Sequence, residues 1–188
     1  MQSIATYLKT PLAILMLGVF FICCKKSDFA HDNLMTYHGK LPDEATANLN
    51  LSFSDSGKVS FSISAPLLNK YSGENKYMDC PEGITIISYD PNGVPEAKLQ
   101  ADYAISEEKT HRLEARRNVV ITNLKSHDTL LTKKIVWDKR SKRIYSNTKV
   151  EQHRPDGTVN IGDGFDADER FSKYTVRNPR GQVIAKDL

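Results

Sequence analysis

The residues with the most recognisable chemistry lie near the carboxyl end, where Gly162, Asp163 and Gly164 precede Phe165. This spacing superficially fits the glycine fingerprint of dinucleotide-binding proteins, in which a pyrophosphate lies at the amino end of a helix. The fingerprint needs a strand before the glycines and a crossover helix after them. No helical pattern surrounds this run, so we do not expect it to bind a dinucleotide.

Carboxylates in the same region supply the hard oxygens that calcium prefers. Asp163, Asp166, Asp168 and Glu169 do not follow the spacing of an EF-hand loop, which favours a solvated acidic turn.

The remaining candidates for catalysis are isolated. His127-Asp128 has no accompanying Gly-x-Ser-x-Gly elbow, and the chain has no Gly-x4-Gly-Lys-Ser/Thr phosphate loop. The histidines are scattered, and none pairs with another at the spacing of metal ligands: His31, His38, His111, His127 and His153. The sequence therefore predicts a protein that is not an enzyme and that has no metal or cofactor.

The amino terminus has the pattern of an export signal, with Lys9 before an apolar run over residues 11–24 that ends at Lys25. As a helix this run is about 21 Å long, too short for a hydrocarbon core of roughly 30 Å. We favour cleavage before Cys24 and acylation of Cys24, with a short membrane anchor and simple secretion as the alternatives. All three place the rest of the chain outside the cytoplasm.

The segment that follows, residues 25–45, is polar and aperiodic and contains Pro42, so we expect it to be a tether. If Cys23 and Cys24 are removed or acylated, only Cys80 is left, and a single cysteine cannot form an internal disulfide. We expect Cys80 to be buried. The predicted division is a signal or anchor over 1–24, a tether over 25–45 and one domain over 46–188.

From Ala45 onward apolar and polar residues alternate, which indicates β-strands. Residues 49–53 and 59–63 both follow this pattern and flank Asp55-Ser56-Gly57, a run suited to a hairpin turn. Alternation also continues over residues 99–105, and further strands are expected at 84–86, 119–121, 130–137, 143–146, 149–152 and 159–163. Turns are expected at residues 90–93, 154–157 and 178–181. The domain is therefore predicted to be almost entirely antiparallel sheet.

A weak internal repeat appears when the second half is shifted against itself by about 31 residues. Leu113 then matches Ile144, and Val119 matches Val150. Stacked strand pairs of this kind would form one continuous apolar trough suited to a long, thin ligand. The formal net charge is only +3, and the basic residues do not form the clustered stripe that nucleic acid requires.

In the order and spacing of several short runs, residues 45–188 resemble the LptC family, the periplasmic component of the lipopolysaccharide export machinery. The runs are Leu51-Ser52-Phe53-Ser54-Asp55-Ser56-Gly57-Lys58, Pro81-Glu82-Gly83-Ile84, Ala101-Asp102-Tyr103-Ala104, Asn118-Val119-Val120, Asp128-Thr129-Leu130-Leu131-Thr132, Trp137-Asp138 and Gly162-x-Gly164-Phe165.

The resemblance implies a twisted, open antiparallel β-jellyroll anchored to the inner membrane on its periplasmic side. Its groove would shield the acyl chains of lipopolysaccharide between an inner-membrane ABC transporter and the periplasmic bridge protein LptA. Apolar residues of the expected strands would line the groove: Leu49, Leu51, Phe53, Val59, Phe61, Ile63, Ile84, Ile86, Leu99, Tyr103, Val119, Ile121, Ile135, Trp137, Ile144 and Phe165.

The carboxyl-terminal segment has no later strand to cover it, so we expect an open edge there that pairs with a partner strand. This edge would include Gly162, Gly164, Tyr174, Val176 and Val183. Two alternatives come from other classes. An envelope lipoprotein that docks proteins would have a groove filled by side chains. An enzyme acting on envelope glycans would need a carboxylate pair in the groove, and the odd positions of residues 49–63 and 99–105 contain no acid apart from Asp55 in the turn.

Overall fold

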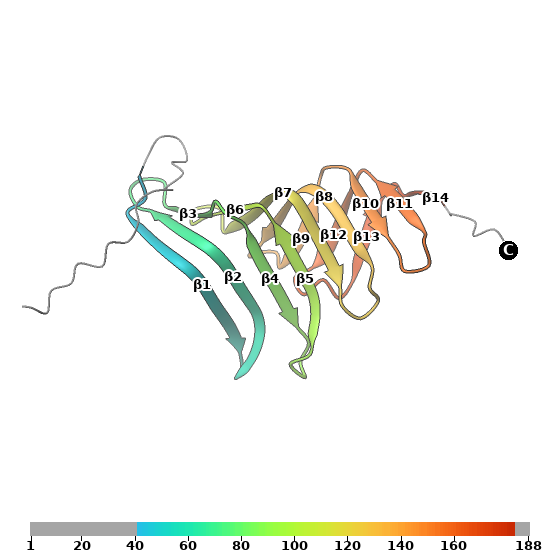
Figure 1. Ribbon diagram of the computed structural model, residues 1–188, viewed down its shortest axis with the longest axis horizontal. Coiled ribbons are helices and arrows are strands. Elements are labelled where there is room, and N and C mark those ends of the chain that lie inside the picture. The colour runs from blue at the N-terminus through green and yellow to red at the C-terminus, as the bar shows by residue number, and fades with distance from the viewer. Residues whose placement is uncertain (1–40, 183–188) are drawn as a thin grey trace, which may run out of the picture. The chain divides into compact units, whose positions relative to one another are not determined.

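The alternating pattern forms fourteen antiparallel β-strands in the computed structural model, which describes residues 41–182 (Figure 1). All regular secondary structure in these residues is β-strand, so the all-β prediction is confirmed. The strands are β1 (Glu44–Asp55), β2 (Lys58–Tyr71), β3 (Tyr77–Cys80), β4 (Ile84–Tyr89), β5 (Pro95–Ala101), β6 (Tyr103–Glu107), β7 (Arg112–Asn123), β8 (Thr129–Asp138), β9 (Arg143–Ser146), β10 (Val150–His153), β11 (Val159–Gly162), β12 (Gly164–Asp168), β13 (Tyr174–Arg177) and β14 (Arg180–Gln182).

The first hairpin is present as predicted, and a register shift between Phe53 and Ser54 pairs Ser54 with Val59. Phe53 lies opposite Phe61 and Leu51 opposite Ile63, with the chain reversing at Ser56 and Gly57. Both turn residues have positive φ, 52° and 79°, which the tight reversal requires and glycine adopts without strain. The expected signal segment, Cys24 and the tether up to residue 40 lie outside the described residues, and the proposed division of the chain stays a prediction.

Long strands divide the sheet into two layers, because each of them pairs with different neighbours along its length. Residues 112–116 of β7 pair with β6, whereas residues 120–123 pair with β5. Between these two halves the register shifts, and Arg117 and Asn118 have positive φ. Such a bulge bends a strand sharply. The first layer contains β3, β6, β9, β12 and β13, the second contains β4, β5, β10, β11 and β14, and β1, β2, β7 and β8 run through both.

The chain also crosses between layers where one strand ends and the next begins. It crosses at Asp102, whose N–H donates to Arg117 O over 3.1 Å, and again at Asp163, whose N–H donates to Arg177 O over 3.0 Å. The expected single strand over residues 99–105 is therefore wrong. β5 ends at Ala101, and the crossing changes which residues face inward.

Two other expectations about the carboxyl-terminal part are wrong. The supposed acidic turn contains β12, in which Phe165 is fully buried and 5% of Ala167 is exposed. The supposed turn over 178–181 includes the first residues of β14, which pairs with β11. Both strands are too short for periodicity alone to separate them from turns.

The hydrophobic core lies between the two layers. Phe61 of the second layer contacts Trp137 of the first, with ring centroids 5.1 Å apart. Cys80 is buried there, as predicted, and burial together with the neighbouring Asp79 charge raises the pKa of its thiol to about 11. The outer face of the first layer is charged, with ion pairs such as Arg112 to Asp138 at 3.4 Å.

Candidate functional site

A continuous row of apolar side chains crosses the second layer. Its members lie opposite one another in successive strand pairs, so the row runs across the strands: Leu51, Ile63, Ile86, Leu99, Ile121 and Leu130. The exposed fraction falls from 44% at Leu51 to 1% at Leu130. The row therefore leads from an exposed end on the β1–β2 hairpin into the core.

The same row becomes polar beyond Leu130, where Gln152 and then Asn160 are the next members. Asn160 Nδ2 donates to Gln152 Oε1 over 2.9 Å, and Gln152 Nε2 donates to Tyr174 Oη over 2.6 Å. Tyr174 belongs to the first layer, and its hydroxyl donates to Asp128 Oδ2 over 2.6 Å. This polar network joins the two layers and ends the apolar interior. Burial and the Asp128 carboxylate raise the pKa of Tyr174 to about 12.

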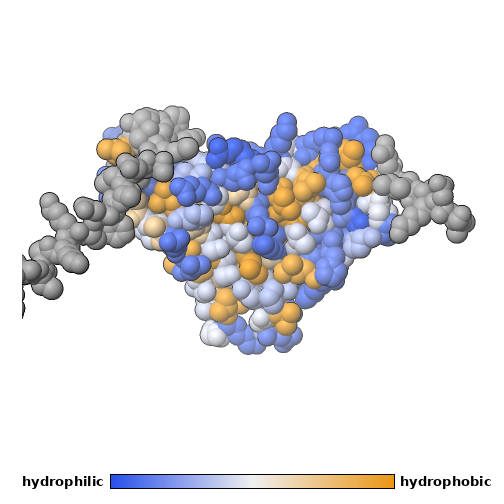
Figure 2. All heavy atoms as spheres, in the orientation of Figure 1, coloured by the Kyte–Doolittle hydropathy of each residue, from blue (hydrophilic) through white to orange (hydrophobic). Residues whose placement is uncertain are grey.

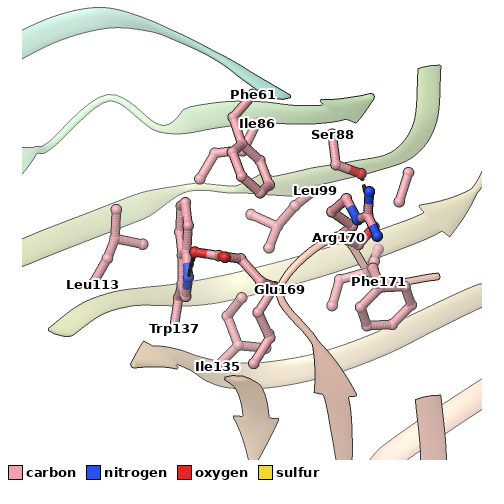
Figure 3. A pocket seen from close by; sticks show the side chains of 13 residues that line it. Phe61, Ile86, Ser88, Leu99, Leu113, Ile135, Trp137, Glu169, Arg170 and Phe171 are labelled. Carbon is pink, nitrogen blue, oxygen red and sulfur yellow. Dashed lines mark hydrogen bonds between the residues drawn. The ribbon is translucent and has the colours of Figure 1, made fainter. Parts of the chain in front are cut away.

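Facing the row, the first layer contributes the second wall of the interior. Leu113, Trp137, Ile144 and Ala167 lie opposite one another in successive strands, and Tyr174 is the next member. Figure 3 shows Phe61, Ile86 and Leu99 on one side of this interior and Trp137 and Ile135 on the other.

Little empty space remains between the walls. The cavity between them, called the inner cavity, has a volume of about 30 Å³, which is room for about one water molecule. It is lined by both layers and by residues 169–171, which connect β12 to β13. An open cavity of about 570 Å³ lies outside this connection, between Phe53 and Phe61 on one side and Lys142 and Arg170 on the other.

Most predicted groove residues come together in this interior. Nine belong to the buried core cluster: Ile84, Ile86, Leu99, Val119, Ile121, Ile135, Trp137, Ile144 and Phe165. Leu49, Phe61 and Ile63 are partly buried against it. Leu51, Phe53 and Val59 remain 44%, 49% and 38% exposed on the β1–β2 hairpin, near whose lower tip Figure 2 shows hydrophobic residues among polar ones. The prediction for Val59 is wrong, because the register shift after Phe53 places Val59 beside Ser52 on the other face of the hairpin.

Tyr103 does not join this set. Because the chain crosses layers at Asp102, its neighbour Ala104 faces the core instead. The Tyr103 ring lies under the Arg117 guanidinium at 5.1 Å, and its hydroxyl donates to Asp79 Oδ2 over 3.4 Å.

The residues predicted for the partner edge do not all lie on an edge of the sheet. Gly162 and Gly164 are buried at the crossing into β12, where a side chain on Gly162 would meet Val176 and the backbone oxygen of Arg177. Tyr174 is directed into the polar network rather than outward. Val176 lies on β13, whose only partner among the described strands is β12, so β13 is an edge strand. Val183 lies outside the described residues.

Sequence reasoning missed the connection over residues 169–171 and the partners Asp128 and Gln152. Phe171 was the only available signal, as an apolar residue within a polar turn, and 3% of it is exposed.

Asp163 and Asp166 bind Arg180 and Arg143 in ion pairs. Within residues 41–182 no group of three or more His, Cys, Asp or Glu side chains could hold a metal ion.

These features define a class of protein: an open, two-layer antiparallel β-jellyroll whose interior is apolar from an exposed hairpin at one end to a polar network at the other. The family model described as "Lipopolysaccharide-assembly, LptC-related" matches residues 12–178, so the chain belongs to the LptC family. Comparison with curated proteins gives no match.

Membership in this family gives the chain a role in lipopolysaccharide transport, as an envelope component that faces the periplasm. The family is a transport component and not a known enzyme family. Within residues 41–182 no helix is long and apolar enough to span a membrane.

Proposed function

We propose that the interior holds the acyl chains of lipopolysaccharide, receives them from an inner-membrane ABC transporter and passes them to the periplasmic bridge protein LptA. The observation that supports this most is the unbroken apolar row from the exposed Leu51 to the buried Leu130. Acyl chains entering at the β1–β2 hairpin would stay in contact with apolar side chains along the whole row.

The physical reason for such a row is the free energy of exposed hydrocarbon, about 25 cal/mol per Å². Each acyl chain that crosses the aqueous periplasm needs a continuous apolar surface. Binding through apolar contacts alone is non-covalent and permits transfer onward. The energy for directed movement would come from the ATPase of the transporter.

The anchor and the partner surface are parts of the same proposal. Acylated Cys24 would attach the chain to the inner membrane. The edge of β13 would pair with a strand of LptA, because the unpaired backbone groups of an edge strand form a template for another chain.

One observation favours a second candidate, an envelope protein that uses the sheet to dock other proteins. The inner cavity of about 30 Å³ is too small for an acyl chain as it stands. A docking protein with a filled core would show this property, whereas a lipid carrier must open its interior.

Photo-crosslinking in cells separates the two candidates. In one variant of the full chain a benzophenone amino acid replaces Phe61, which lines the interior. In the control variant it replaces Ser52, which lies on the opposite face of the hairpin. Adducts with lipopolysaccharide, detected with an antibody to the glycolipid, are expected from Phe61 and not from Ser52. Protein adducts without lipopolysaccharide at Phe61 would support docking and reject lipid transport.

A further inference from the structure

We propose that residues 169–171 form a clasp that closes the side of the interior and occupies the place of an acyl chain until the ligand displaces it. This inference rests on the proposed function. It accounts for an interior that is apolar along its length yet has almost no free volume.

The first observation is the position of Phe171. Its side chain is 3% exposed, packs edge-on against Phe165 with ring centroids 5.7 Å apart and stacks on Tyr174 at 5.2 Å. The turn thus inserts an aromatic side chain between the two layers, as Figure 3 shows.

The second observation is the backbone of the same residue. Phe171 has φ of 58°, in the left-handed region that bulky residues rarely adopt. Surrounding contacts have to hold such a conformation, and strained residues of this kind gather at switches and ligand clamps. Its strain would be released if the clasp opened.

The third observation is that few polar contacts hold the clasp to the two layers. Ser88 Oγ of the second layer donates to Arg170 O over 2.9 Å, and Trp137 Nε1 of the first layer donates to Glu169 Oε1 over 3.2 Å (Figure 3). The clasp therefore joins the two layers at a point where no strand connects them. A third bond, from the Phe171 N–H to Asp168 O over 3.0 Å, lies within the turn and can persist, so only the two bonds to Ser88 and Trp137 have to be replaced by water when the clasp moves.

The fourth observation is the space on either side. Phe61, Glu169 and Arg170 line both the inner cavity and the open cavity of about 570 Å³. Outward movement of the clasp would join these two spaces. The ligand would then enter through the open cavity beside Phe53 and Phe61 of the β1–β2 hairpin.

The first test replaces Phe171 with glycine in the full chain that carries the photo-crosslinker at Phe61. Phe171→Gly removes both the inserted ring and the strain, so the lipopolysaccharide adduct should increase about fivefold because the open state no longer has to be selected. His111→Gly is the matched control, because His111 is exposed in the β6–β7 turn and has φ of 54°. An unchanged or smaller adduct in a stably accumulating Phe171→Gly protein would overturn the proposal.

The second test locks the clasp with the double variant Ser88→Cys and Arg170→Cys, in which a disulfide replaces the hydrogen bond between the layers. Non-reducing electrophoresis shows whether the bond forms. The adduct from Phe61 should be lost in oxidised cells and return with reductant, whereas in either single variant the adduct should not respond to reductant. An equal adduct in the locked and reduced states would overturn the clasp, and this test decides if Phe171→Gly does not accumulate.

The crosslinking results distinguish an incorrect clasp proposal from an incorrect proposed function. If the chain does not carry lipopolysaccharide, Phe61 gives no adduct in any variant. If it does carry lipopolysaccharide without a clasp, the adduct is present and is unaffected by Phe171→Gly and by the lock.

Discussion

Tyr174 shows how a single hydroxyl group can close the end of an apolar interior. It accepts a hydrogen bond from Gln152 and donates one to Asp128, which links the first layer to the second. Satisfied polar groups of this kind hold one geometry, whereas an unpaired buried group would cost stability. The network therefore sets where the apolar row stops.

This role predicts a pH-dependent effect of Tyr174→Phe. The variant should lose about 1 to 2 kcal/mol of stability because Asp128 and Gln152 lose a partner. The folded-state pKa of about 12 lies above the ordinary 10.0, so the neutral phenol is favoured by folding. The stability difference should be fully present below pH 10 and disappear as the pH rises through about 12.

Urea unfolding followed by the fluorescence of Trp137, the single tryptophan, measures this difference. Tyr145→Phe serves as the control, because Tyr145 lies on the outer face of β9 and should give little difference at any pH. A difference for Tyr174→Phe that is constant across the whole alkaline range would contradict the assignment.

At the scale of the elements, the crossings between layers decide which face each strand presents. The crossing from β11 to β12 depends on Gly162, whose lack of a side chain lets β13 approach closely. A Cβ there would meet the backbone oxygen of Arg177, which cannot move without shifting β13.

Gly162→Ala should therefore destabilise the domain by about 1 to 3 kcal/mol. Gly181→Ala is the matched control and should cost less, because its Cβ would meet a side-chain atom, Asn160 Oδ1, and no backbone atom. Thermal unfolding of the two variants by circular dichroism compares them directly. Equal melting temperatures for both would mean that the crossing tolerates a side chain.

Residues 41–182 form an open array with edge strands at its ends, β1 at one and β13 and β14 at the other, each paired on one side only. The proposed contact with LptA uses the second end. Deleting residues 171–188 would not test this contact cleanly, because the deletion also removes Phe171 and Tyr174, which pack in the interior.

Photo-crosslinking from single positions avoids this problem. Thr175 is exposed on β13, so a crosslinker there should form adducts with LptA, whereas one at Ser52 on β1 should form none. The comparison requires equal amounts of both proteins in the cell. LptA adducts at Ser52 alone would place the junction at the opposite end of the array.

A second prediction at this scale concerns attachment to the membrane. Cells that make the chain in the presence of labelled fatty acid should incorporate label into it, and Cys24→Ala should abolish the label. Wild-type protein of unprocessed mass without label would show that Cys24 is not the anchor, and would favour a membrane-embedded helix over residues 11–24.

Local patterns determined much of this protein. The hairpin from Leu49 to Ile63 could be predicted, because alternation and a turn with positive φ act within a few residues, whereas its register shift between Phe53 and Ser54 could not. The all-β class followed for the same reason. The order of short runs over residues 45–188 was enough to indicate the LptC family, which the family match confirms.

Only the tertiary structure decided which side of each strand faces inward after a crossing. Tyr103 continues the alternation of β5 in sequence, but the crossing at Asp102 places Ala104 in the core instead. The clasp and the polar network could not be predicted from the sequence either. Ser88 and Arg170 are 82 positions apart, and Asp128 and Tyr174 are 46 apart. Such contacts depend on which strands become neighbours, and periodicity within one strand contains no information about its distant partners.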